Sequence, residues 1–190
     1  TIAEAVFART LSAIKTERVA AAQVLRGPET TTWPERSALL AQLRGALMAA
    51  KVCAYAQGFA LMRAADREQQ WQLPMAQVAQ VWRAGCIIRA HLLEDIRSAY
   101  SGQADLPNLL VDPHFARVMA DKQQDLRQVV AQAALHGVPM PAFMSALSYY
   151  DAYRSARLPA NLLQAQRDFF GAHTYQRTDR AGKFHTRWSD

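Results

Sequence analysis

The chain has 190 residues, of which 51% are hydrophobic and 20% are charged, values that are ordinary for a globular protein with one core. No uninterrupted apolar run approaches the roughly 18 residues that a membrane span needs, and Glu4 and Arg9 interrupt the apolar start, so we expect neither a membrane segment nor a signal peptide. The net charge of +6 indicates an anionic partner without identifying its kind.

The first half of the chain predicts two helices. Apolar residues recur with a helical period over residues 2–25, and the pair at 27–28, Gly-Pro, ends that pattern. A long helix is expected from about 34 to 70, and Gly58 within it predicts the close approach of a neighbouring helix. Two adjacent apolar stripes predict that this helix is central and buried on more than one side. The stripes consist of Leu40, Leu43, Leu47, Ala50, Ala54 and Leu61, and of Met48, Val52, Tyr55, Phe59 and Met62.

The second half predicts shorter helices separated by proline and glycine. They are expected over 75–85, over 86–100 with Ile87, Ile88, Leu92 and Ile96 facing inward, from Pro113 to Leu135, over 142–157 and over 160–171. Asp112 before Pro113 is a typical N-cap followed by proline in the first helical turn. No strand pattern occurs, so the sequence predicts an all-α fold, with a helical domain over 1–170 and an extended tail over 171–190.

The cysteines and the basic residues carry no metal or nucleic-acid motif. Cys53 and Cys86 lie among apolar residues, which predicts buried, reduced thiols rather than a disulfide or metal site. The arginines are scattered and form no Lys/Arg run, so a solvated basic surface is favoured over a nucleic-acid footprint. We expect no metal site, and the sequence has no GxGxxG or GKS/T loop and no HExxH motif.

The segment QRDFFGAHTY contains the best candidate site. Arg167 offers a planar fork that matches phosphate oxygens, and His173 beside a phosphate would add a second charged donor. The alternatives are that Arg167 is simply solvated and that His173 donates to the last carbonyls of its helix.

The segments LPANLLQAQRDFFGAHTYQR and GKFHTRW resemble the C-terminal end of decarboxylating 6-phosphogluconate dehydrogenases. EAVFARTLSAIKTER, YAQGFALM, WRAGCIIRAHLLEDI, NLLVDPHF and GVPMPAFMSALSYYDAYRS follow in the order of that family, so the resemblance spans essentially the whole chain. It implies that the dinucleotide-binding domain, and the lysine and glutamate that move protons, lie upstream of Thr1. One departure from the family pattern concerns the tail, where FHTRWSD stops early through either natural variation or truncation.

The resemblance implies a substrate site but no catalytic residue in this chain. The arginine of the VFAR block, Arg9, is expected to contact substrate, and Arg167 and His173 are expected to bind 6-phosphogluconate in the active site of the other subunit of a homodimer. The implied reaction is the oxidation of 6-phospho-D-gluconate by NADP, bound mainly by the upstream domain, with loss of CO2 to give ribulose 5-phosphate.

The resemblance also implies a cytoplasmic enzyme of the pentose phosphate pathway and of gluconate utilization. The 190 residues alone are expected to fold and dimerise without catalysing turnover. The competing hypotheses are a basic helical nucleic-acid binder and a purely structural oligomerisation domain. We expect no nucleic-acid partner and no membrane partner. The choice between NADP and NAD depends on the upstream domain.

Overall fold

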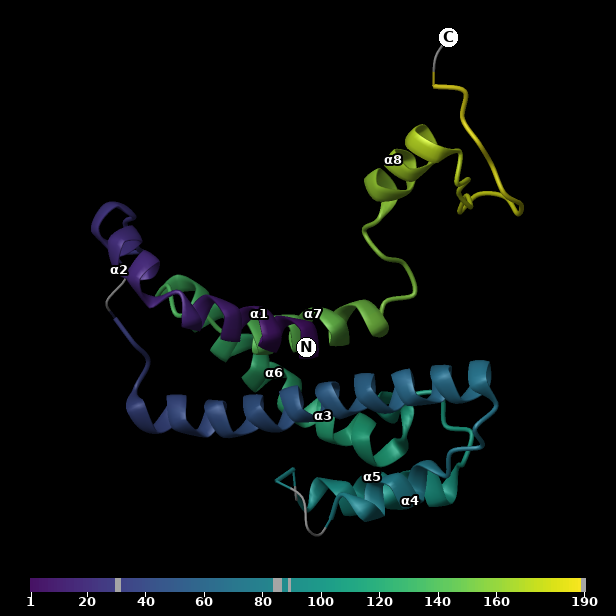
Figure 1. The fold of residues 1–190 in the computed structure, drawn as a ribbon, viewed down its shortest axis with the longest axis horizontal. Helices are drawn as coiled ribbons and strands as arrows, with labels where there is room; N and C mark the ends of the chain where they lie inside the picture. The colour runs from purple at the N-terminus through teal and green to yellow at the C-terminus, as the bar shows by residue number, and fades with distance from the viewer. Residues whose placement is uncertain (30–31, 84–86, 89, 189–190) are drawn as a thin grey trace. The chain divides into compact units, whose positions relative to one another are not determined.

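The computed structural model describes residues 1–29, 32–83, 87–88 and 90–188, and over these residues it contains α-helices and one short 3-10 turn but no β-strand (Figure 1). The elements are α1 (Ile2–Ala13), α2 (Lys15–Val24), α3 (Arg36–Gln69), α4 (Met75–Val81), α5 (Leu92–Gly102), η1 (Leu109–Val111), α6 (Pro113–Leu135), α7 (Pro141–Tyr153) and α8 (Asn161–Gly171). The prediction of an all-α fold is confirmed.

The chain forms two compact units, Thr1–Asp151 and Ala152–Asp190, which are described separately below. The boundary lies near the end of α7, so α8 belongs to the same unit as the tail that follows it. The functional division expected at residue 170 stays a prediction.

Helix α3 is the centre of the first unit because it packs against both α6 and η1, while α4 packs against α5 (Figure 1). Its buried face consists mainly of small side chains: Gly45, Ala46, Ala49, Ala50, Val52, Cys53, Ala56 and Phe59. The larger side chains of this core come from the facing elements, among them Phe115 and Leu126 of α6. Small residues on one helix allow the axis of the other to come close.

Gly45, and not Gly58, is the position at which the absence of a side chain allows another helix to come close to α3. A Cβ atom at Gly45 would lie 1.8 Å from Oδ2 of Asp125 on α6, whereas a Cβ atom at Gly58 would meet nothing within 4 Å. The prediction for Gly58 is therefore wrong, since the close contact with α6 is at Gly45.

The stripe of leucines predicted to be buried on α3 is largely exposed. Leu40, Leu47 and Leu61 are 56%, 52% and 68% exposed, because no described element of the first unit covers that side of the helix. The second stripe is better predicted, with Val52 and Phe59 fully buried. Helix α3 therefore contacts several other elements, as predicted for a central helix, but it is buried mainly on the face that carries small residues.

Two local boundaries differ from the sequence expectations. The helix predicted over 2–25 is interrupted at Ile14, which has non-helical angles (φ −86°, ψ 53°), and the Arg18 guanidinium donates to the Ser12 carbonyl at the break (3.3 Å). Ile87 and Ile88 lie in a turn and are exposed, because α5 begins only at Leu92. Their predicted inward orientation is therefore wrong.

The ends of α6 agree with the predicted signals. The Asp112 carboxylate accepts from the backbone N–H groups of His114 (2.9 Å) and Phe115 (3.2 Å), as expected of an N-cap. At the other end the ring of His136 stacks on Trp33 at 3.7 Å between ring centroids. Its two ring nitrogens lie within hydrogen-bonding distance of the Gln132 and Thr32 carbonyls, so this histidine links the end of α6 to the segment before α3.

By length and composition, α3 is the helix of the described chain that could cross a membrane, which the absence of long uninterrupted apolar runs did not anticipate. The same composition is typical of the core helix of a globular unit, and α3 buries eight residues against its neighbours. Its packing against α6 and η1 favours the core role.

Cys53 is a free, fully buried thiol, as predicted, whereas Cys86 lies outside the described residues. Burial raises the pKa of the Cys53 thiol to about 12, because the thiolate would lose its hydration. We expect the peptide containing Cys53 to stay unlabelled by iodoacetamide at pH 8 in the native protein and to be labelled fully in denaturant. Peptide mapping by mass spectrometry measures this, and rapid native labelling at Cys53 would contradict it.

Candidate functional site

The candidate site lies at the C-terminal end of α8, where the chain turns back sharply. The residue with left-handed angles at this end is Ala172 (φ 50°), and Thr174 is left-handed as well (φ 62°). Two such non-glycine residues cost about 1–3 kcal/mol each, so the surrounding structure must compensate. His173 lies between them, and its direction is therefore set by an unusual backbone.

Gly171 provides the space into which the His173 imidazole folds. A Cβ atom at Gly171 would lie 2.7 Å from Nε2 and 2.9 Å from Cδ2 of His173, so the ring occupies the place that a side chain at 171 would take. Arg167 is four residues before Gly171, on the same face of α8. The geometry therefore makes the imidazole a neighbour of Arg167 on that face.

Arg167 and His173 are both exposed, and neither has a hydrogen-bond or ion-pair partner among the residues that the structure describes. A guanidinium fork and a neighbouring imidazole offer several unused N–H donors to an oxyanion. Both predicted residues therefore lie at the C-terminal end of α8 with donors that no described residue uses, and their role in binding phosphate stays a prediction.

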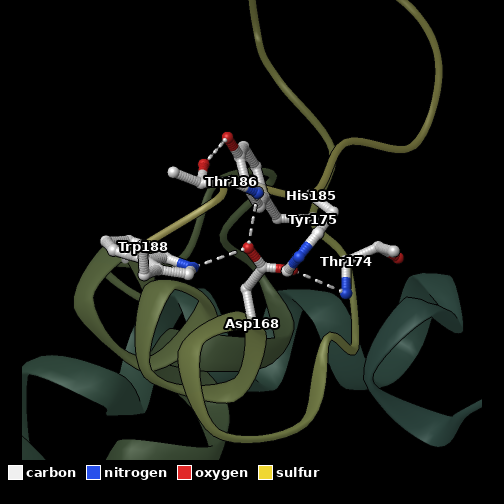
Figure 2. Close-up of polar contacts among 6 residues, drawn as sticks. All are labelled: Asp168, Thr174, Tyr175, His185, Thr186 and Trp188. Carbon is white, nitrogen blue, oxygen red and sulfur yellow. Dashed lines mark hydrogen bonds and ion pairs between the residues drawn. The ribbon is translucent and has the colours of Figure 1, made fainter. Parts of the chain in front are cut away.

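Directly beside Arg167, the side chain of Asp168 is fully buried and holds the tail against α8 (Figure 2). Oδ1 accepts from the Thr174 backbone N–H (3.1 Å) and from Nδ1 of His185 (2.9 Å). Oδ2 accepts from the Thr186 backbone N–H (2.9 Å) and from Nε1 of Trp188 (3.0 Å). A carboxylate only accepts, so Nδ1 of His185 carries a proton in this contact. We call these five residues the Asp168 clasp.

The Asp168 clasp keeps its carboxylate ionised. Desolvation by burial raises the pKa, but the hydrogen bonds from Thr186, His185 and Trp188 favour the charged form and outweigh it. The net result is a pKa of about 2, below the ordinary value of 3.8. A carboxylate that is depressed in the folded state stabilises the fold above its unfolded pKa, and this contribution is lost as the pH falls through the folded pKa.

We expect the Asp168 clasp to stay intact from neutral pH to about pH 4 and to be lost as the pH falls through about 2. The measurement is an NMR titration of the Asp168 carboxyl carbon together with the Trp188 indole N–H signal. Asp168→Asn provides the control, in which the indole signal should lose this acid transition. A carboxyl midpoint at or above 3.8, the ordinary value, would contradict the expectation.

The remainder of the tail forms a small hairpin around the clasp. Tyr175 and Phe184 pair as an isolated antiparallel bridge, with N···O distances of 2.9 and 2.8 Å, and the Tyr175 hydroxyl lies 2.7 Å from that of Thr186 (Figure 2). A cavity of about 720 Å³ beside it is lined by Arg157, Asn161 and Arg177, among others, but not by Arg167 or His173. In the described chain no group of three or more His, Cys, Asp or Glu side chains could hold a metal ion.

Arg9, the third predicted substrate contact, lies on α1 in the first compact unit, so it is described apart from Arg167 and His173. Its side chain is exposed, and the residues one turn away on the same face are Ala5, Val6, Ser12 and Ala13. These short side chains leave the guanidinium uncovered by its own helix.

The chain is similar to known proteins over nearly all of its length. A family profile described as "6-phosphogluconate dehydrogenase, C-terminal domain" matches residues 1–188. Two curated relatives, both named "6-phosphogluconate dehydrogenase, decarboxylating", come from Staphylococcus epidermidis and Staphylococcus aureus; each is 50% identical over 187 residues, which cover 98% of this chain and 40% of the relative. The chain thus spans about two fifths of the length of these relatives.

A solved structure gives the same result at the level of the fold. Plasmodium falciparum 6-phosphogluconate dehydrogenase, described in its apo form and in complex with its cofactor NADP+ and its substrate 6-phosphogluconate, superimposes with a TM-score of 0.86 at 37% identity. The match covers 95% of this chain and 39% of that protein.

Proposed function

Because this chain belongs to the 6-phosphogluconate dehydrogenase family as its C-terminal domain, we propose that the whole protein oxidatively decarboxylates 6-phospho-D-gluconate to ribulose 5-phosphate with NADP. The described chain serves this reaction by binding the substrate phosphate and by forming a homodimer. Hydride acceptance and proton transfer belong to residues outside it, so these 190 residues alone are inactive. The free thiol of Cys53 is in keeping with a cytoplasmic location.

The observation that supports the proposal is the placement of Arg167 on α8 and of the His173 ring against Gly171, one helical turn further along. Gly171 leaves space for the imidazole beside the guanidinium, and the donors of both side chains are unused in the described chain. A phosphate of about two negative charges is well matched by a planar fork and a second donor. Arg9 supplies a further cation to the substrate in this proposal.

Exposed apolar side chains support the proposed homodimer. Helix α8 carries Leu162, Leu163, Phe169 and Phe170, which are 80%, 56%, 58% and 78% exposed. Several large apolar side chains exposed on one short helix are typical of a protein interface. We propose that α8 and the tail lie against a second copy of the chain, so that Arg167 and His173 complete the partner's substrate site while Arg9 serves its own.

The shared site has a direct test in mixed dimers of the intact protein. Arg9→Ala and Arg167→Ala are each expected to impair both sites of a homodimer. When the two variants are dissociated and reassociated together, half of the dimers are mixed, and each mixed dimer contains one unaltered site. Activity at low substrate concentration should therefore recover to about a quarter of that of the unaltered protein.

The control is the same mixing experiment with differently tagged copies of Arg167→Ala alone, which should regain nothing. If isolated mixed dimers do not recover activity, the proposal that each site is shared between two subunits is contradicted. If neither variant changes the KM for 6-phosphogluconate, the proposed phosphate-binding role itself fails.

A further inference from the structure

We propose that Asp168 is a positioning residue for substrate binding, which acts on the phosphate through His173 and never touches it. The inference rests on the proposed function of Arg167 and His173. It gives a functional role to the fully buried carboxylate of Asp168, which lies between the candidate phosphate ligands Arg167 and His173 in the sequence. A buried charge costs stability unless it is well paired, and the four donors of the Asp168 clasp supply this pairing.

The path from Asp168 to His173 is short. The Asp168 backbone carbonyl accepts from the N–H of Ala172 (2.9 Å), and its side chain accepts from the N–H of Thr174 (3.1 Å). One residue thus holds the backbone on both sides of His173. Both held residues have positive φ, a conformation that alanine and threonine adopt only when the surroundings impose it.

This backbone directs the imidazole onto Gly171 and hence beside Arg167. Without the hydrogen bond to Thr174, residues 172–174 are free to leave the left-handed region, and the ring leaves the space above Gly171. Arg167 is within α8 and keeps its place in the helix when the turn relaxes. Asp168 therefore controls one of the two phosphate ligands and not the other.

The donors of the clasp offset part of the negative charge of Asp168, which weakens its repulsion of the anion. His185 Nδ1, Trp188 Nε1 and two backbone N–H groups cover its two oxygens, and the side chain is 0% exposed. The carboxylate is thus enclosed on the side of the tail, while Arg167 and His173 are exposed.

The test is a set of double-mutant cycles in the intact enzyme, with the KM for 6-phosphogluconate and the KM for NADP measured separately. Asp168→Asn keeps the shape of the side chain and removes its charge; it should raise the KM for 6-phosphogluconate about tenfold and leave that for NADP unchanged. In a His173→Ala background the same change should add less than about twofold. In an Arg167→Ala background its effect should be retained in full.

A second variant perturbs His173 without altering the carboxylate. Gly171→Ala places a methyl group where the ring lies, and it should raise the KM for 6-phosphogluconate as much as His173→Ala does, with no loss of helix stability. The control is Asp179→Asn, which removes a carboxylate of the same unit that is paired with Arg177 and should leave the KM unchanged.

The outcomes separate the two proposals. If Asp168→Asn raises the KM equally with and without His173, Asp168 acts only on the general stability of the tail, and the inference is overturned. It is also overturned if Asp168→Asn has no effect while His173→Ala has one. If Arg167→Ala and His173→Ala both leave the KM unchanged, the proposed function fails first.

Discussion

Arg167→Ala in the intact protein is expected to raise the KM for 6-phosphogluconate about tenfold to a hundredfold. The guanidinium has no partner among the described residues, so its donors are available to substrate, and the loss of a charge-assisted contact costs about 1.5–3 kcal/mol. Steady-state kinetics at saturating NADP measures this change. The KM for NADP should not move, because the cofactor is proposed to bind mainly outside this chain.

Two further substitutions distinguish the contribution of the bidentate guanidinium geometry from that of its positive charge. Arg167→Lys keeps the charge but loses the bidentate geometry, so its KM should lie between those of the unaltered protein and Arg167→Ala. Arg187→Ala removes an equal charge from an exposed position in the same compact unit and should change the KM less than twofold. An unchanged KM in Arg167→Ala would favour a purely structural oligomerisation domain.

Phe59→Ala is expected to lower the free energy of unfolding by about 3–5 kcal/mol, the cost of a large cavity in a packed core. The Phe59 ring is fully buried, stacks on Tyr100 with 5.2 Å between ring centroids and meets the edge of Trp82 at 5.7 Å. Its removal therefore takes away contacts to two aromatic rings on α5 and at the end of α4. Urea denaturation of the 190-residue chain, followed by circular dichroism, measures the change.

Phe59→Leu is the matched control, since it keeps much of the apolar volume and should cost less than half as much as Phe59→Ala. Equal costs for the two substitutions would show that the aromatic contacts, and not the cavity, determine stability at this position. A loss below about 1 kcal/mol for Phe59→Ala would contradict the burial described here.

The helices with local start and stop signals could be predicted from the sequence, and those whose limits depend on tertiary contacts could not. Asp112 and Pro113 fix the start of α6 through interactions within one turn, and the predicted end at Leu135 agrees with the structure. The break at Ile14 has no comparable signal, because it coincides with an arginine side chain that caps a carbonyl six residues earlier.

Glycine roles were the hardest to infer, because a glycine in the sequence does not specify which neighbour needs the space. Gly58 and Gly45 look alike within α3, yet only Gly45 faces an element that would collide with a side chain. Gly171 is the last residue of α8, yet the left-handed residue at this helix end is Ala172, and the glycine makes room for His173.

Arg167 and His173 were identified from residue type and from the family resemblance, but Asp168 was missed. Its donors lie 6, 17, 18 and 20 residues downstream, so no short spacing indicates the contact. An acidic residue on a short helix is usually solvated, and only the fold of the tail reveals that this one is enclosed.

The small residues at the contact between α3 and α6 limit which substitutions the fold can accept. A helix pair separated by methyl groups and a bare Cα has little room for growth, so random enlargements on the α3 side push the axes apart. Replacing an α3 residue at this contact by a smaller one removes little volume, because most of these residues are already alanine or glycine. We therefore expect substitutions at this contact to be tolerated better at the larger residues of α6, such as Phe115 and Leu126, than at the small residues of α3.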